Sequence, residues 1–209
     1  MSREQTDTRT KILQAALELL ESSGGKGVRV GDIAKQAGIS RQALYLHFAT
    51  RAELLIAVTH YVDDMKDMDA RLAPSRTAET GAERLDAFIE AWSAYIPEVY
   101  GVARALLAMR DTDEAAAAAW DKRMGDMREG CEAAIKALER DRMLSPEHDP
   151  DGATDILWTM LSVRNWEQLT ITCGWTQGRY VSTLKTLARQ IFVANDGGDW
   201  GETPSLIRG

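Results

Sequence analysis

Proline is scarce in this sequence of 209 residues, which contains only five. Between Pro74 and Pro146 the only proline is Pro97, so long stretches rich in Ala, Leu, Glu, Lys and Arg run without a helix breaker. Such stretches favour an all-α protein. Hydrophobic residues make up 44% of the chain and charged residues 27%. This ordinary composition predicts a sizeable core, in one large domain or in a small and a medium one.

Cysteine and long hydrophobic runs are also lacking. Cys131 and Cys173 lie far apart, without a CxxC neighbour or a nearby histidine partner. Their number excludes a disulfide framework and indicates a reducing compartment. The first residues are polar and lack the apolar core of a signal peptide. No uncharged apolar run approaches the roughly 18 residues that a membrane span needs. We therefore predict a soluble cytoplasmic protein without a membrane partner.

The charge is unevenly distributed along the chain. Residues 1–50 contain seven lysines and arginines against five acidic residues, a net charge of +2. Because the whole chain carries −7, the remainder carries −9. A basic head on an acidic body is typical of a DNA-binding protein with a second domain that does not touch DNA, because phosphate attraction matters only where the duplex docks.

Three helices are predicted in the head, over residues 8–22, 30–37 and 41–48. The first has apolar residues at helical spacing and is expected to end at Gly24-Gly25. Gly38 closes the second helix, and Ser40 is a good N-cap for the third. A short helix, a glycine-containing turn and a second helix make a helix-turn-helix, whose second helix fits the major groove.

The third helix has two faces. Leu44 and Phe48, four residues apart, are expected to face the core. The polar face comprises Arg41, Gln42, Tyr45 and His47. Just beyond, Thr50 and Glu53 have the spacing of a capping box, so a fourth helix is predicted to start there and to pass any movement directly to the DNA-reading unit.

The head resembles the TetR family of repressors. Residues 12–20, 30–41 and 44–48 follow that family's signature in order and spacing. This resemblance covers about the first quarter of the chain. It implies a homodimer of helical subunits, each with a small DNA-binding head and a larger helical body. From the residues themselves, we predict no cofactor, metal or catalytic residue.

The resemblance also implies roles for individual residues. Tyr45 and His47 would contact phosphates, and Arg51 would touch the backbone at the start of the fourth helix. Gln42 and Arg41 would read bases, since Gln can pair bidentately with adenine and Arg with guanine. Ser40 is expected mainly as a cap that can also meet a phosphate.

Three positions depart from the family pattern. Gly25 replaces a common aromatic residue, so Val28 and Val30 must close that part of the core. Arg29 stands where Ser or Thr commonly caps the second helix, so the cap is lost unless Arg29 gives a phosphate contact in exchange. Leu46 replaces a commonly polar residue and is assigned no role.

The body is predicted to be a helical bundle joined directly to the head. Glycine, proline and aspartate turns divide it into helices over 51–72, 79–96, 98–110, 113–143, 151–172 and 177–194, with a break at Pro74-Ser75. The predicted domains are a DNA-binding head at 1–50, a ligand-binding and dimerisation body at 51–195, and a flexible tail at 196–209.

The last two long helices carry the oligomerisation signal. Residues 156–161 are apolar almost all round, more than one face of a small bundle requires. The final helix carries an apolar stripe formed by Tyr180, Leu184, Leu187, Ala188 and Ile191. A monomer would expose much of this surface, so a two-fold four-helix interface is expected. The alternative is that both helices are covered within one subunit.

Large, adaptable side chains in the middle helices are candidates for a ligand pocket. The predicted lining is Trp92, Tyr95, Met109, Trp120, Met124 and Trp158. Ordinary bundle core is the alternative for each of them. His60, Asp63 and Asp64 lie on one helix face, but three ligands from one face make a poor tetrahedral metal site.

The sequence therefore predicts a repressor that a small, largely apolar ligand releases from a palindromic operator. Two alternatives remain open. The body could sense a protein partner, or the chain could be a helical enzyme that has borrowed the head. The sequence has no GxSxG motif and no phosphate loop, and His148 lies in a proline-rich turn where solvation is expected.

Overall fold

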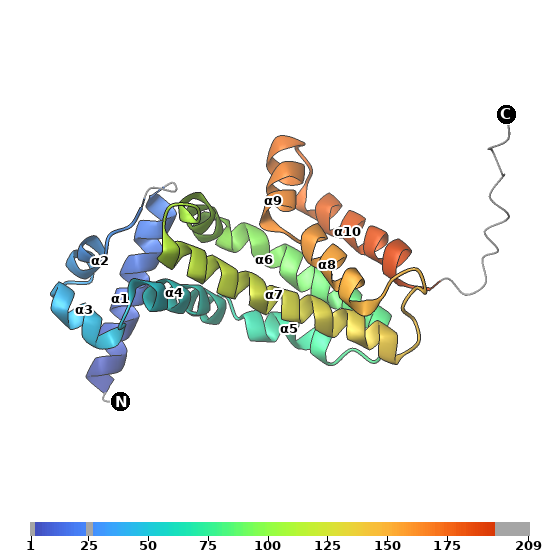
Figure 1. The fold of residues 1–209 in the computed structure, drawn as a ribbon, viewed down its shortest axis with the longest axis horizontal. Helices are drawn as coiled ribbons and strands as arrows, with labels where there is room; N and C mark the ends of the chain where they lie inside the picture. The colour runs from blue at the N-terminus through green and yellow to red at the C-terminus, as the bar shows by residue number, and fades with distance from the viewer. Residues whose placement is uncertain (1–2, 24–26, 195–209) are drawn as a thin grey trace.

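The computed structural model describes residues 3–23 and 27–194, and these form a helical protein, as predicted (Figure 1). The helices are α1 Arg3–Ser22, α2 Val30–Gln36, α3 Arg41–His47, α4 Arg51–Met65, α5 Met68–Arg76, α6 Gly81–Met109, α7 Glu114–Arg140, α8 Pro150–Met160, α9 Val163–Trp166, the π-helical η1 Glu167–Thr172 and α10 Gln177–Phe192. None of these helices combines the length and the apolarity that crossing a membrane would require. The predicted glycine stop at 24–25 and the predicted tail lie outside the described residues.

The head consists of α1 to α3, which lie together at one end of the molecule beside the start of α4 (Figure 1). Its core is the one expected from periodicity. Ile12 and Ala16 of α1, Ile33 of α2, and Leu44 and Phe48 around α3 are all at most 1% exposed. Val28 and Val30 are also buried, as predicted for the part of the core where the family often has an aromatic residue. The apolar residues at helical spacing therefore predicted the core of the head correctly.

The helix predicted over 51–72 is wrong in its length. The chain leaves α4 at Lys66 and turns at Asp67, which has a left-handed backbone with φ of 52°. Lys66 and Arg71 flank this turn, and both pair with Glu98 of α6, at 3.5 and 2.7 Å. The break at Pro74 is also wrong, because α5 continues through it; a proline deprives a helix of one hydrogen bond, which this short helix tolerates.

Pro97 does not divide the long helix either, since α6 runs through it without interruption. A proline removes the hydrogen bond to the carbonyl four residues earlier, here that of Ser93. Nε2 of Gln177, from α10, donates to the Ser93 carbonyl oxygen at 2.7 Å. Oε1 of Gln177 accepts from Nε1 of Trp166 at 2.9 Å. A long-range side-chain contact thus replaces the missing backbone bond.

The helix predicted over 151–172 is three shorter elements, α8, α9 and η1. Trp92 of α6 donates from Nε1 to the carbonyl oxygen of Leu161 at 3.0 Å, which satisfies a buried backbone acceptor at the break. Ser162 then caps α9 by accepting from the amide of Asn165 at 3.2 Å. A cap so placed starts a new helix with a new direction.

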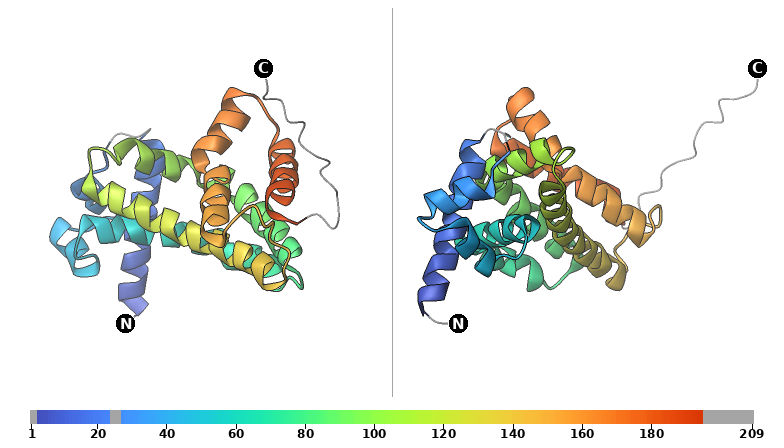
Figure 2. Two further views of the ribbon diagram at one scale, coloured as in Figure 1. Left: turned by 45° about the vertical axis from the view of Figure 1, so that its right-hand side comes forward. Right: turned by 60° about the vertical axis from the view of Figure 1, so that its left-hand side comes forward.

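The apolar stripe of α10 is largely buried within this chain, and the dimer interface predicted for the last two helices stays a prediction. Tyr180, Leu184, Ala188 and Phe192 are buried, because α10 packs on α6 and α8 (Figure 2). Leu187 of the same stripe is 41% exposed, and Ile156 of α8 is 38% exposed. The exposed apolar surface of these two helices is therefore smaller than the sequence alone predicts.

Candidate nucleic-acid interface and effector pocket

The recognition helix α3 is fixed by a cap at its start and by apolar anchors beneath it. The hydroxyl oxygen of Ser40 accepts from the amide of Ala43 at 3.0 Å, which confirms the predicted cap. Leu44 and Phe48 anchor the helix in the core. The predicted polar residues Arg41, Gln42 and Tyr45 are exposed, while His47 is half-buried. The helix therefore exposes its polar face to solvent, while its cap and its buried apolar residues hold it in place.

Arg9 of α1 supports this helix from behind, a role that sequence reasoning missed. Its Nη1 donates to the carbonyl oxygen of His47 at 3.1 Å, and its guanidinium lies 4.2 Å from the centroid of the Phe48 ring. The first contact satisfies a carbonyl at the helix end. Since the two residues are 38 positions apart, no local pattern signals this contact.

An open depression between α2, α3 and the start of α4 gathers four of the predicted DNA contacts. Arg29, Arg41, Tyr45 and Arg51 all line it. The Arg29 side chain makes no capping hydrogen bond to α2, as expected, and it is exposed. The guanidinium of Arg41 lies 5.7 Å from the centroid of the Tyr45 ring. Asp32 and Asp113 also line the depression, so its three arginines and two aspartates leave a small net positive charge beside the exposed face of α3.

Arg51, predicted as a phosphate contact, also forms several contacts within the protein. Its Nε and Nη2 donate to the carbonyl oxygen of Val28 at 3.2 and 2.9 Å. Its Nη1 pairs with Oδ1 of Asp113 at 2.5 Å. Asp113 is the N-cap of α7 and accepts from the amides of Ala115 and Ala116. One side chain thus ties the head, α4 and α7 together.

Two opposing effects act on the Asp113 carboxyl. Burial acts to raise its pKa, but hydrogen bonds from Arg51 and from the amides of Ala116 and Ala115 outweigh burial, so the pKa lies below its usual value. A pKa lower in the folded than in the unfolded state means that the ionised carboxylate stabilises the fold above the unfolded-state pKa. This contribution is lost as the pH falls through the folded-state pKa.

Asp113→Asn is expected to lower the free energy of unfolding at neutral pH by about 1–2 kcal/mol, because Arg51 loses its charged partner while Asn preserves the N-cap. The difference from wild type should persist as the pH falls to about 4, near the unfolded-state pKa of an aspartate, and should shrink only below that, as the pH falls through the lower folded-state pKa of Asp113. Urea unfolding followed by circular dichroism measures both effects.

Asp149→Asn is the matched control for this prediction. Asp149 also caps a helix, accepting from the amide of Gly152 at 2.8 Å, but it has no arginine partner among the described ion pairs. A smaller loss of unfolding free energy is expected there, because no arginine loses its partner. Equal losses in the two variants would contradict the role given to Arg51.

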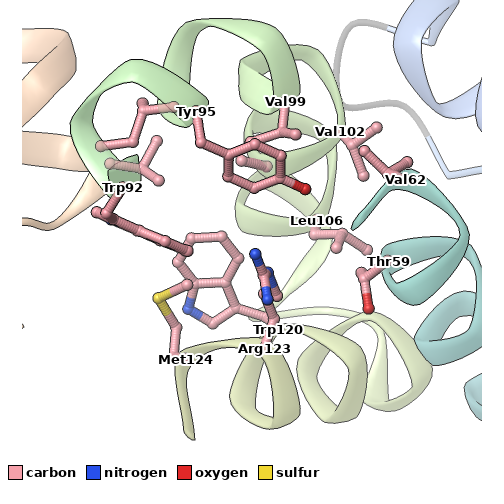
Figure 3. A pocket seen from close by; sticks show the side chains of 13 residues that line it. Thr59, Val62, Trp92, Tyr95, Val99, Val102, Leu106, Trp120, Arg123 and Met124 are labelled. Carbon is pink, nitrogen blue, oxygen red and sulfur yellow. The ribbon is translucent and has the colours of Figure 1, made fainter. Parts of the chain in front are cut away.

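The body contains an apolar pocket between α4, α6 and α7 (Figure 3). Four of the six predicted lining residues border it, namely Trp92, Tyr95, Trp120 and Met124. Met109 is buried in the core at the end of α6 and does not line it. Trp158, on α8, lines a neighbouring groove on the far side of Trp120. The free space is about 30 Å³, room for roughly one or two waters.

A polar corner interrupts this apolar lining. The phenol of Tyr95 donates to Oδ1 of Asp63, and Nη2 of Arg123 lies 3.0 Å from the same oxygen. The guanidinium of Arg123 lies 5.0 and 5.5 Å from the ring centroids of Trp92 and Tyr95. Burial raises the pKa of Asp63, and the charge of Arg123 partly offsets this. Burial, together with Asp63, also raises the pKa of Tyr95.

Arg123 was not predicted, because a lone arginine within an amphipathic helix usually lies at the surface. Asp63 was considered only with His60 and Asp64 as a poor metal site. No group of metal-ligating side chains occurs in the described part of the chain, and His60 points to solvent. The structure instead joins Asp63 to α6 and α7.

Comparison with known proteins agrees with this architecture. A family model described as bacterial regulatory proteins of the tetR family matches residues 12–58, from α1 into α4. The nucleoid occlusion factor SlmA of Marinomonas sp. is 39% identical over 64 residues, which are 31% of this chain and about a third, 32%, of that protein. The HTH-type transcriptional regulator EthR of Mycobacterium tuberculosis is 30% identical over 149 residues, 69% of this chain and 67% of EthR.

The chain belongs to the TetR family of transcriptional regulators. Its α2–α3 pair lies within the matched region, so it is the DNA-binding helix-turn-helix of a TetR-family regulator. A putative transcriptional regulator from Saccharomonospora viridis, solved in complex with choline, has the same fold, with a TM-score of 0.70 at 18% identity over 91% of this chain and all of that one. The likeness thus extends through the body.

Proposed function

We propose that this TetR-family regulator is a homodimeric repressor that a small, largely apolar effector releases from a palindromic operator. The observation that carries the proposal is the exposed polar face of α3, seated on Leu44 and Phe48 beside a depression lined by arginines. A two-fold dimer would present two such helices to successive major grooves of a symmetric site.

The side chains around α3 divide into readers and positioning groups. Gln42 and Arg41 lie in the first turn of α3 and would meet base edges. Tyr45, His47, Ser40, Arg29 and Arg51 would contact the phosphate backbone. The Arg51–Asp113 ion pair competes with a phosphate for the same guanidinium, so DNA binding through Arg51 would loosen its tie to α7.

The proposed switch runs through α4. Thr59 and Val62 of α4 line the apolar pocket, and the same helix begins at Arg51, three residues after Phe48. An effector that holds α4 in another position would change the spacing of the two recognition helices. A 100-fold preference of the effector for that state supplies about 2.7 kcal/mol. The choline complex of the Saccharomonospora protein supports a small-molecule effector.

The decisive test of DNA binding is selection of bound sequences from random duplex DNA by the purified protein. We expect enrichment of one palindromic site, with an affinity that falls steeply as salt is raised. Absence of any salt-sensitive preference would overturn the proposal.

Gln42→Ala is expected to relax base preference at one position in each half-site, at a cost of about 1–3 kcal/mol in discrimination. Tyr45→Phe and His47→Ala should instead weaken all sequences similarly, because a phosphate contact has no sequence information. Repeating the selection with each variant, together with titrations on the enriched site, separates the two effects. Unchanged base preference in Gln42→Ala would remove Gln42 as a reader.

A further inference from the structure

The apolar pocket in the body lies next to a larger groove, and the two share lining residues. The groove has a volume of about 510 Å³. Trp92 and Arg123 line both. The pocket alone is too small for most effectors, whereas ligand sites commonly occupy about 300–1,000 Å³. Movement of Arg123 would join the two spaces into one site of that size.

The groove is lined by acidic side chains together with two aromatic ones. Phe88 and Trp92 contribute the aromatic surface. Two arginines and five aspartates also line it: Arg76, Arg123, Asp63, Asp64, Asp67, Asp69 and Asp126. Arg76 pairs with Asp69 at 2.8 Å, and Lys122 pairs with Asp126. Asp64 and Asp67 have no ion pair among the described residues, so the groove has a net negative charge.

Arg123 occupies the position that a ligand's positive charge would take. Its guanidinium lies over the rings of Trp92 and Tyr95 (Figure 3). It also lies beside the carboxylate of Asp63, with Nη2 3.0 Å from Oδ1. Aromatic faces and a carboxylate attract cations in a site shielded from water. Nη2 of this guanidinium is buried and, among the described residues, forms no hydrogen bond, although it lies 3.0 Å from Oδ1 of Asp63. A ligand cation would compete with Arg123 for the Asp63 carboxylate.

An anionic effector fits this site poorly. It could pair with Arg123, but it would have to pass the acidic groove and lie beside Asp63, with Asp126 nearby. Like charges in a partly buried site repel strongly. A cation gains from the same groups, and its apolar part can occupy the space bounded by Trp120, Val102 and Leu106.

We propose that the effector is a lipophilic cation, which enters from the acidic groove, displaces Arg123 from Asp63 and takes its place against the rings of Trp92 and Tyr95, whose centroids are 5.8 Å apart. This inference rests on the proposed function and specifies its ligand class. Because Asp63 is on α4 and Arg123 is on α7, the exchange would break the ion pair between these helices and free α4 to move.

Three probes of similar shape distinguish the possible charges. Benzyltrimethylammonium is the cation, neopentylbenzene is its uncharged isostere, and 3-phenylpropionate is an anion. Isothermal titration calorimetry on the full-length protein should show binding of the cation at least roughly tenfold tighter than of either other probe. Tighter binding of the neutral or anionic probe would overturn the proposal.

Arg123→Met gives the sharpest test, because the two charge classes respond in opposite directions. If Arg123 competes with the ligand, its removal should tighten benzyltrimethylammonium binding roughly tenfold. If Arg123 is instead an anion receptor, the variant should lose 3-phenylpropionate and leave the cation unchanged. A thermal melt checks that the variant is folded.

Asp63→Asn provides a second, isosteric variant and should weaken cation binding roughly tenfold while sparing the neutral probe. Glu98→Gln is the matched control, since Glu98 pairs with Lys66 and Arg71 nearby but lines neither the pocket nor the groove. If both substitutions weakened cation binding equally, the effect would come from the overall negative charge of the body, and this would contradict a specific site at Asp63.

The operator selected from random DNA separates failure of this inference from failure of the proposed function. A protein that binds its operator but binds no cation, or keeps the operator at saturating cation, refutes the effector class alone. A protein that selects no duplex refutes the repressor proposal, whatever it binds in the body.

Discussion

Phe48→Ala is expected to lower the free energy of unfolding of the head by about 3–5 kcal/mol. The Phe48 side chain is fully buried beneath α3, and the guanidinium of Arg9 lies over its ring. Alanine leaves a cavity between α1 and α3 and removes the aromatic face on which Arg9 rests. The recognition helix α3 then loses its packing against α1, so the affinity for the operator should fall together with the free energy of unfolding.

Leu46→Ala is the matched control for this prediction. Leu46 is two residues away in α3 but is 85% exposed, so its loss should change the unfolding free energy by less than about 0.5 kcal/mol. Urea unfolding of both variants, with circular dichroism and with operator binding as readouts, measures the contrast. Similar stabilities for the two variants would contradict the packing described for Phe48.

Leu187→Glu is expected to convert the dimer into monomers and to weaken operator binding on the order of a hundredfold. Leu187 of α10 and Ile156 of α8 remain exposed, although their apolar neighbours Leu184, Ala188 and Leu157 are buried, and we propose that this exposed apolar surface contacts the partner subunit. A carboxylate placed in an apolar interface loses its hydration without a partner. A monomer then binds one half-site and loses the gain that comes from linking two.

Ser182→Glu on the same helix is the control for charge alone. Ser182 is also exposed, but it lies five residues from Leu187, and at about 100° per residue it points to a different side of α10. Sedimentation velocity should show a dimer for this variant and a monomer for Leu187→Glu. A dimer in both would place the interface elsewhere.

The head could be predicted from sequence because its signals are local. The cap of α3 joins Ser40 to Ala43, and the core stripe repeats every three or four residues. Even there the prediction was incomplete. Thr50 caps α4 as expected, but the carboxylate of Glu53 accepts from the amide of Ala49 instead of that of Thr50. The choice between neighbouring amides depends on the exact path of the backbone.

The body was predicted less well because distant contacts decide its helix ends. Proline usually ends a helix, yet α6 continues through Pro97 because Gln177, far along the chain, satisfies the Ser93 carbonyl. The apolar stripe of α10 was predicted correctly as a stripe. Whether it faced its own subunit or a partner depended on how α6 and α8 packed, and the sequence does not show this.

The sequence by itself determined the all-helical fold, the helix-turn-helix and the polar face of its second helix, since these follow from backbone preferences, caps and periodicity within one or two turns. Only the tertiary structure placed Arg51 on Asp113, Arg9 under α3, and Arg123 between Asp63 and two aromatic rings. Each of these cations finds its partner tens of residues away. Such a pairing depends on how whole helices pack, and an arginine on a helix has the same local pattern whether it faces solvent, DNA or a buried carboxylate.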